Sequence, residues 1–299
     1  MRLFESAGFA EPLSKQIADA VKKVAVGIRT AVAVNDQHNR IEQIVSNAAG
    51  HFETSIFIVG GWDWRRPDGG LYQRRDADLS YMAPHLINQC RSILSVWLRT
   101  ERKPSDCWIE FGNEVDGSYW KNNLGQFFNV AMACYRKVRE ASEHSPFITG
   151  STMNFNKGRL WNRNGYDVMK ELCAFGWPRD TLQGLHPYRQ EGRGWPSFKS
   201  DAKALAALSK LLRGRRVAVT EMGWRSNEQH TDAKIAAMTR EEIDMWRRFG
   251  SACFVHYQIV DAPRPNNRGE GAFGAFSAHV DGLAPKPVAE VLEAQRGLA

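Results

Sequence analysis

Two glutamates stand where this sequence is most able to do chemistry. Glu114 follows the apolar segment CWIEFGN, and Glu221 follows RVAVT. Acidic side chains are rare at the ends of buried strands, because an unpaired buried charge is costly. A single glutamate of this kind is more often an ion-paired structural residue. Two of them on the same face of a sheet indicate the carboxylate pair of a retaining glycosidase, in which one group protonates the leaving oxygen and the other attacks the anomeric carbon.

The elements that would position these glutamates alternate between short apolar runs and helical patterns. Strands are expected at 3–4, 27–34, 55–60, 107–112, 147–150, 182–185, 216–220 and 252–260. Helices are expected at 14–25, 39–49, 82–98, 123–141, 166–175, 201–212, 231–249 and 287–294. Such alternation means parallel strands with helical crossovers. Eight units in this length predict one (β/α)8 TIM barrel over residues 1–299, rather than an open doubly wound sheet. Its active site would lie at the C-terminal ends of the strands.

Four segments resemble, in the same order, motifs of the clan A glycoside hydrolases, the retaining (β/α)8 enzymes that include families 5 and 39. The segments are IEFGNE at 109–114, HPY at 186–188, VTEMGW at 219–224, and DG at 281–282 followed by PKP at 285–287. They are similar to the family patterns W-E-x-x-N-E, H-x-Y, T-E-x-G-W and D-G-x-x-K-P. The resemblance is to the clan, with a family 39-like and a family 5-like enzyme as the two alternatives.

The resemblance points to roles for five residues of these motifs. Glu114 would be the acid/base, with a pKa raised by its surroundings, and Glu221 the ionised nucleophile beside cationic or hydrogen-bonding neighbours. Asn113 would offer its amide to the sugar 2-hydroxyl, and Tyr188 would hydrogen-bond Glu221. His186 would bind a substrate hydroxyl or Glu114. For Asn113, His186 and Tyr188 a purely local structural role is the alternative.

A third glutamate, Glu110, lies four residues before Glu114, so strand alternation places both on one face. Glu110 would sit deeper in the barrel and would need a positive partner. Arg29, inside an expected strand, is the first candidate, and Arg2 is the second. These residues are expected to orient charge rather than to catalyse.

The sequence departs from the clan pattern at three points. Gly112 replaces an aromatic residue, and Val115 replaces the frequent proline after the acid/base. At strand eight the clan often has a tryptophan under the sugar, whereas this chain has His256-Tyr257-Gln258. Tyr257 is therefore the substrate-binding candidate there, and the departures concern the geometry of the −1 subsite rather than the class of reaction.

Aromatic residues gather after the expected strands. Sugars stack their C–H faces on aromatic rings, so the candidates for sugar subsites are Trp62, Trp64, Trp120 and Trp224. Trp224 is the best single choice among them. Several subsites predict an oligo- or polysaccharide substrate and endo action. The alternative for each ring is packing, which we expect for Trp97, Trp108, Trp177 and Trp246.

Charge and motif content narrow the possible partners. The net charge is +7, but the expected elements include no basic helix or zinc-finger spacing, so nucleic acid is not expected. Arg65, Arg66, Arg74 and Arg75 flank Trp62 and Trp64. They raise the hypothesis of an anionic glycan, although a solvated loop is the favoured interpretation.

Other classes of protein lack support in the sequence. It contains no H-E-x-x-H or G-x-S-x-G motif, so no metal, no cofactor and no serine hydrolase are expected. No segment is apolar enough to span a membrane. Five widely spaced cysteines predict reduced thiols, and a monomer is expected. The first residues resemble no secretory signal, which predicts a cytoplasmic protein unless a signal was removed. The functional alternatives are a non-catalytic glycan-binding barrel and a transglycosylase.

Overall fold

Eight parallel strands close into a barrel in chain order in the computed structural model. The structure describes residues 1–7, 12–32, 38–60, 83–115, 123–152, 165–188, 201–224, 230–261, 273–279 and 282–298. The strands are β1 (Arg2–Ser6), β2 (Gly27–Ala31), β3 (Thr54–Val59), β4 (Cys107–Phe111), β5 (Phe147–Thr152), β6 (Leu182–Leu185), β7 (Val217–Met222) and β8 (Cys253–His256). Pairing of Leu3 with Phe254 joins β1 to β8 and closes the barrel. The predicted (β/α)8 fold is confirmed.

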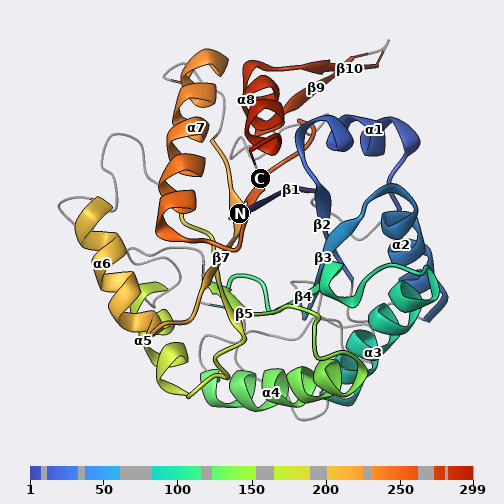
Figure 1. The fold of residues 1–299 in the computed structure, drawn as a ribbon, viewed down its shortest axis with the longest axis vertical. Helices are drawn as coiled ribbons and strands as arrows, with labels where there is room; N and C mark the ends of the chain where they lie inside the picture. Colours follow the sequence, from blue (N-terminus) through green and yellow to red (C-terminus); the bar gives the residue numbers. More distant parts are fainter. Residues whose placement is uncertain are drawn as a thin grey trace.

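In the described part of the chain, eight α-helices form a ring around these strands (Figure 1). They are α1 (Lys15–Val24), α2 (His38–His51), α3 (Ala83–Arg99), α4 (Leu124–Ala141), α5 (Gly165–Ala174), α6 (Asp201–Leu212), α7 (Asp232–Phe249) and α8 (Pro287–Arg296), with a 3-10 turn (Pro104–Asp106) before β4. Local signals set their ends. The Ser14 and Thr231 side chains accept from backbone N–H groups as N-caps of α1 and α7. Gly250 ends α7 in the left-handed region at φ 85°.

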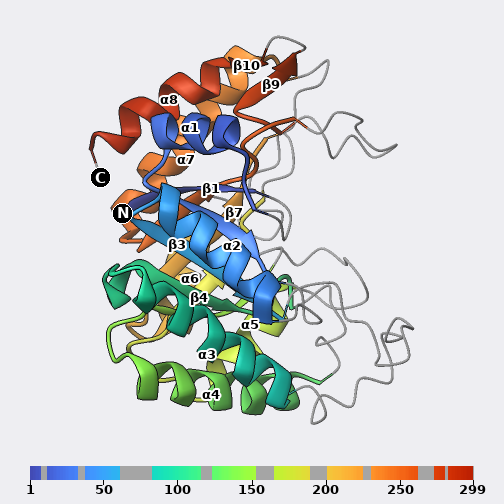
Figure 2. The ribbon, with the colours of Figure 1, turned by 90° about the vertical axis from the view of Figure 1, so that its right-hand side faces the viewer.

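A short hairpin between β8 and α8 was not predicted. It consists of β9 (Phe276–His279) and β10 (Gly282–Pro285), which pair antiparallel. The hairpin lies beside α8 in both views (Figure 2). Strand eight was expected to run to residue 260 but ends at His256. Beyond it the backbone turns to the segment before β9, where the Ala275 N–H donates to the Gln258 carbonyl at 2.9 Å.

The side chains form two apolar layers. Inside the barrel, Phe4, Ile56, Trp108, Ile148 and Val255 pack together. A larger cluster fills the space between the strands and the helices and contains Trp97, Trp177 and Trp246. The four tryptophans expected in the core are therefore buried. All five cysteines are free thiols, as predicted. No described helix is long and apolar enough to cross a membrane.

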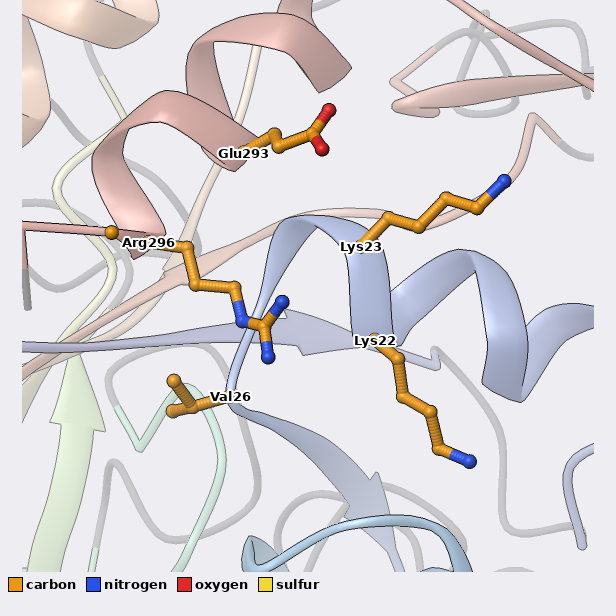
Figure 3. A pocket seen from close by; sticks show the side chains of 6 residues that line it. Lys22, Lys23, Val26, Glu293 and Arg296 are labelled. Atoms are coloured by element: carbon orange, nitrogen blue, oxygen red, sulfur yellow. The ribbon is translucent and has the colours of Figure 1, made fainter.

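A surface pocket of about 590 Å³ lies at the end of the barrel where the strands begin. Its lining residues are Lys22, Lys23, Val26, Glu293, Arg296 and Gly297 (Figure 3). Lys22 and Lys23 lie in the last turn of α1, and Arg296 lies in the last turn of α8. These basic groups therefore lie at the negative ends of two helix dipoles. The basic side chains are thus explained by helix stability, and the pocket is at the opposite end from the glutamate pair.

Candidate active site

The two glutamates predicted to form a pair do meet at one mouth of the barrel. Glu114 follows β4 and Glu221 lies in β7. One carboxylate oxygen of each, together with a ring nitrogen of His186, lie within 4.8 Å of one another. The two carboxylate side chains are 13% and 12% exposed. They are therefore shielded from bulk water yet reachable from the mouth.

The turn after β4 has a left-handed backbone that explains one departure from the clan pattern. Gly112 has φ 81° and Glu114 has φ 48°. A Cβ atom on Gly112 would lie 2.6 Å from the ring of Phe127 on α4. An aromatic residue cannot occupy this position in the present packing, and glycine is the residue that adopts the conformation at no steric cost. The turn directs the Glu114 side chain toward His186.

Arg29, on β2, is the charged centre of the site. Its Nε donates to Glu110 Oε2 at 2.6 Å, and its Nη2 donates to Glu110 Oε1 at 3.0 Å. Nη2 also donates to Asn113 Oδ1 at 2.7 Å, and Nη1 donates to Glu221 Oε2 at 2.9 Å. Burial alone would raise the pKa of Glu110, but the charges and hydrogen bonds of Arg29 and His186 outweigh it and lower that pKa to about 2.

The structure decides between the two predicted partners of Glu110. Arg29 takes that role, whereas Arg2 donates to Asp106 at 2.6 Å at the other end of the barrel. Arg2 lies near the start of β1, so its side chain cannot reach the depth of Glu110. Arg29 also fixes Asn113. A guanidinium has no acceptor, so the amide oxygen must face it, which leaves the amide NH2 to donate elsewhere.

His186 is completely buried at the end of β6. Its Nδ1 lies 3.3 Å from Glu114 Oε1 and 3.8 Å from Glu221 Oε2, while Nε2 lies 3.8 Å from Glu110 Oε1. Burial alone would lower the His186 pKa. The charge of Glu221 and hydrogen bonds with the other two glutamates prevail and raise it to about 9. This favours an imidazolium at neutral pH, and the structure places its Nδ1 in contact with Glu114, as predicted.

The environments of the two paired glutamates differ. Burial and the charge of Glu221 raise the pKa of Glu114, against the lowering effect of His186. Glu221 accepts from two donors, Arg29 on one oxygen and the Tyr188 hydroxyl on the other at 2.6 Å. Burial raises the pKa of Tyr188 well above its usual range, so its phenol keeps the proton that it donates. The predicted Tyr188–Glu221 contact is confirmed, and both donors stabilise negative charge on Glu221.

Aromatic residues near the pair include one that the sequence did not indicate. The ring of Phe273 contacts Tyr188 and Tyr257, with centroids 6.5 Å and 5.7 Å apart. The Asp261 carboxylate accepts from the Gly274 N–H at 2.6 Å and pairs with Lys286 at 2.6 Å, which holds Phe273 in place. Phe273 belongs to none of the motifs recognised in the sequence, so the sequence gives no signal for its place near the site.

Of the tryptophans predicted to bind sugar, only Trp224 lies in the described part of the chain. Trp224 is half-buried and packs against His230 with ring centroids 6.0 Å apart. Its role as a sugar platform stays a prediction. Trp62, Trp64, Trp120 and the arginines at 65, 66, 74 and 75 lie outside the described residues. Two further polar residues lie beneath the site: Ser151, which contacts Glu110, and Thr220, which contacts Ser151. Ser151 belongs to no predicted motif, and Thr220 stands in the segment at 219–224 without a predicted role.

Solved structures of glycoside hydrolases share this architecture. A family 39 glycoside hydrolase from the gut symbiont Bacteroides cellulosilyticus WH2 has a TM-score of 0.67 at 14% identity, over 99% of this chain and 63% of its own. An exo-β-1,4-mannosidase from Opitutaceae bacterium strain TAV5 gives 0.66 at 14%, over 100% and 60%. A GH5_18 enzyme from Bifidobacterium longum, in complex with Manβ1-4GlcNAc, gives 0.68 at 13%, over 100% and 78%. The chain has the barrel fold of these enzymes.

The sequence itself is remote from characterised proteins. No family model matches it, and no curated protein sequence does. The chain spans less than two thirds of the length of the first two enzymes above. At identities of 13–14% the comparison establishes the fold, and the activity has to be argued from the site.

Proposed function

We propose that the chain is a retaining β-glycoside hydrolase with Glu114 as acid/base and Glu221 as nucleophile. The observation that carries the proposal is the approach of the two carboxylates to within 4.8 Å. Retaining enzymes hold their carboxyl groups about 5–5.5 Å apart, whereas inverting enzymes need about 6.5–9.5 Å to admit a water between carboxylate and sugar. The spacing here favours direct attack by a carboxylate.

In the first step Glu221 attacks the anomeric carbon. The bond from that carbon to the leaving oxygen breaks, and the oxygen takes the proton of Glu114. Glu221 suits the attack because Arg29 and Tyr188 hold its carboxylate in one orientation. Glu114 suits the proton transfer because burial and the nearby negative charge raise its pKa.

In the second step a water adds to the glycosyl-enzyme. The ester bond has neutralised Glu221, which removes one of the two causes of the raised Glu114 pKa and leaves burial as the other. The imidazolium of His186, 3.3 Å away, then favours the ionised form of Glu114. Glu114 takes a proton from the attacking water, the sugar leaves with its β-configuration, and both carboxyl groups return to their starting states. The charges around Glu114 therefore support its switch from acid to base.

The substrate is proposed to be an oligo- or polysaccharide with β-linkages. The comparison enzymes include an exo-β-1,4-mannosidase and a complex with Manβ1-4GlcNAc, so β-mannosides belong in the first assays. Endo action and an anionic glycan stay predictions, because the residues on which they rest lie outside the described part of the chain.

A panel of aryl β-glycosides and β-linked polysaccharides tests the proposal. We expect turnover of at least one aryl glycoside by the wild-type protein and its loss in Glu221→Gln, which keeps the shape of the side chain and removes its charge. Glu290→Gln, an exposed glutamate on α8, is the matched control and should keep full activity. Equal activity of wild type and Glu221→Gln would contradict the assignment.

A further inference from the structure

Two side-chain hydroxyl groups are in contact beneath the site, although their strands are not neighbours in the barrel. Ser151 lies in β5 and Thr220 in β7, with β6 between these strands. Their Oγ atoms are 3.0 Å apart. The contact is possible because β6 has Gly184 at this level. A Cβ atom there would lie 2.7 Å from the Ser151 hydroxyl oxygen and 3.0 Å from its Cα. The glycine therefore leaves the space in which the two hydroxyls meet.

The direction of the hydrogen bonds between these groups follows from their chemistry. The Ser151 hydroxyl donates to Glu110 Oε1. Glu110 is ionised, because Arg29 and His186 hold its pKa at about 2, so it can only accept. A serine hydroxyl has one proton, which is engaged in the hydrogen bond to Glu110. Thr220 must then be the donor in its contact with Ser151. The chain of donors runs from Thr220 to Ser151 to Glu110.

The orientation of the Glu110 carboxylate in turn fixes the orientation of the Arg29 guanidinium. The two carboxylate oxygens accept from Nε at 2.6 Å and from Nη2 at 3.0 Å, a bidentate pair that fixes the plane of the guanidinium. With the plane fixed, Nη1 points to Glu221 Oε2 at 2.9 Å. Rotation of the Glu110 carboxylate would rotate the guanidinium and move Nη1 away from Glu221. Ser151 donates to Glu110 Oε1 and opposes this rotation, together with His186, whose Nε2 lies 3.8 Å from the same oxygen.

We infer that Ser151 and Thr220 are positioning residues, which act through Glu110 and Arg29 to hold the donor on Glu221, and that Gly184 exists to let them meet. This inference rests on the proposed function. Ser151, Thr220 and Glu110 are all 0% exposed. In such a setting hydrogen bonds reinforce one another and a missing partner is costly. Thr220 contacts Ser151, Ser151 contacts Glu110 and Glu110 contacts Arg29, so the chain connects the two hydroxyls to the donor on Glu221.

Ser151→Ala tests the inference, with Ser145→Ala as the matched control. Ser145 is equally buried and donates to the Pro104 carbonyl at 2.9 Å, away from the site. On an aryl glycoside we expect kcat to fall about 10-fold in Ser151→Ala with KM within about twofold, because the lost order affects the transition state more than binding. Ser145→Ala should change neither constant.

A second measurement needs no substrate and separates positioning from simple loss of stability. His186 faces Arg29 from β2, Glu110 from β4, Glu114 after β4, Glu221 from β7 and Tyr188 after β6. Without the Ser151 donor the Glu110 carboxylate is more basic and favours the imidazolium more strongly. The NMR titration midpoint of His186 should rise by about 0.5 pH unit in Ser151→Ala and stay constant in Ser145→Ala.

Three further variants complete the test. Thr220→Val removes the first donor and should lower kcat less than Ser151→Ala does, while Thr220→Ser keeps the hydroxyl and should restore it. Gly184→Ala changes no polar group, yet its methyl should displace the Ser151 hydroxyl and reproduce the Ser151→Ala values. Unchanged kcat and an unchanged His186 midpoint in folded Ser151→Ala would overturn the inference. A wild-type protein without glycosidase activity would reject the proposed function instead, and the His186 titration would still test the donor chain.

Discussion

Arg29 donates a hydrogen bond of 2.9 Å from Nη1 to Glu221 Oε2. The two residues lie on strands β2 and β7, and the same guanidinium is held by Glu110 from β4. Three strands thus fix the orientation of one carboxylate. Arg29 lowers the pKa of the buried Glu110 and also directs a donor to Glu221, the acid that is proposed to react.

Arg29→Lys should lower kcat by about 100-fold or more. An ammonium group cannot make the planar bidentate contact with Glu110 and also reach Glu221, so the charge remains but the orientation is lost. Steady-state kinetics on an aryl glycoside measure the effect. Arg2→Lys, which alters the pair with Asp106, is the control and should keep kcat within about twofold. Full activity in Arg29→Lys would show that charge alone is sufficient.

Tyr188→Phe should lower kcat by about 10- to 100-fold. The substitution removes the 2.6 Å donor to Glu221 but keeps the ring that packs against Phe273. Tyr135→Phe loses a hydroxyl that donates to Asp180 on the surface and should leave kcat unchanged. If both variants behaved alike, the Tyr188 hydroxyl would have no catalytic part.

Stability should fall at alkaline pH because of His186. The pKa of His186 is raised from 6.5 to about 9 on folding, so its contribution is fully present below about pH 6.5 and is lost as pH rises through 9. A shift of this size corresponds to about 3 kcal/mol. Denaturant unfolding at pH 6, 8 and 10 measures it, and His186→Asn should show a flatter dependence between pH 6 and 10. Parallel curves for the two proteins would contradict the charged state of His186.

Glu110 should make the opposite contribution at acid pH. Its pKa is lowered to about 2, so the stability that it supplies is present above about pH 4.5 and is lost as pH falls through 2. Glu110→Gln should therefore be destabilised at neutral pH, because Arg29 loses its buried counter-charge, and should differ less from wild type near pH 2. Thermal unfolding at both pH values gives the comparison. A constant difference would mean that Glu110 is not ionised.

The sequence predicts the barrel well because each βα unit is encoded locally. Leu182–Leu185 and Asp201–Leu212 were located to the residue, since apolar runs and helical spacing define them. Strand alternation predicted Glu110 and Glu114 on one face. Both lie near His186, but β4 ends at Phe111 and the left-handed turn after it brings Glu114 there. Contacts across strands were predicted only where a charge needed a partner or a motif suggested one, as for Arg29 with Glu110 and Tyr188 with Glu221. The meeting of Ser151 and Thr220 depends on the register of three strands and on Gly184 between them, and the position of Phe273 depends on the unpredicted hairpin.

The roles of the two glutamates can be told apart by azide. Glu114→Ala still forms the glycosyl-enzyme from an activated aryl glycoside, and azide can attack it to give a β-azide. Glu221→Gly leaves space for azide to attack the substrate directly and give an α-azide. NMR spectroscopy identifies both products. If the two anomers came from the opposite variants, Glu114 and Glu221 would have exchanged roles.

The most direct test of the account is the configuration of the first product. Proton NMR of the anomeric region, recorded within minutes of adding wild-type protein to an aryl β-glycoside that it hydrolyses, precedes mutarotation of the released sugar. The closeness of Glu114 and Glu221, within 4.8 Å, predicts that the β-anomer appears first and the α-anomer only later, by equilibration. Initial release of the α-anomer would contradict double displacement by these two carboxylates.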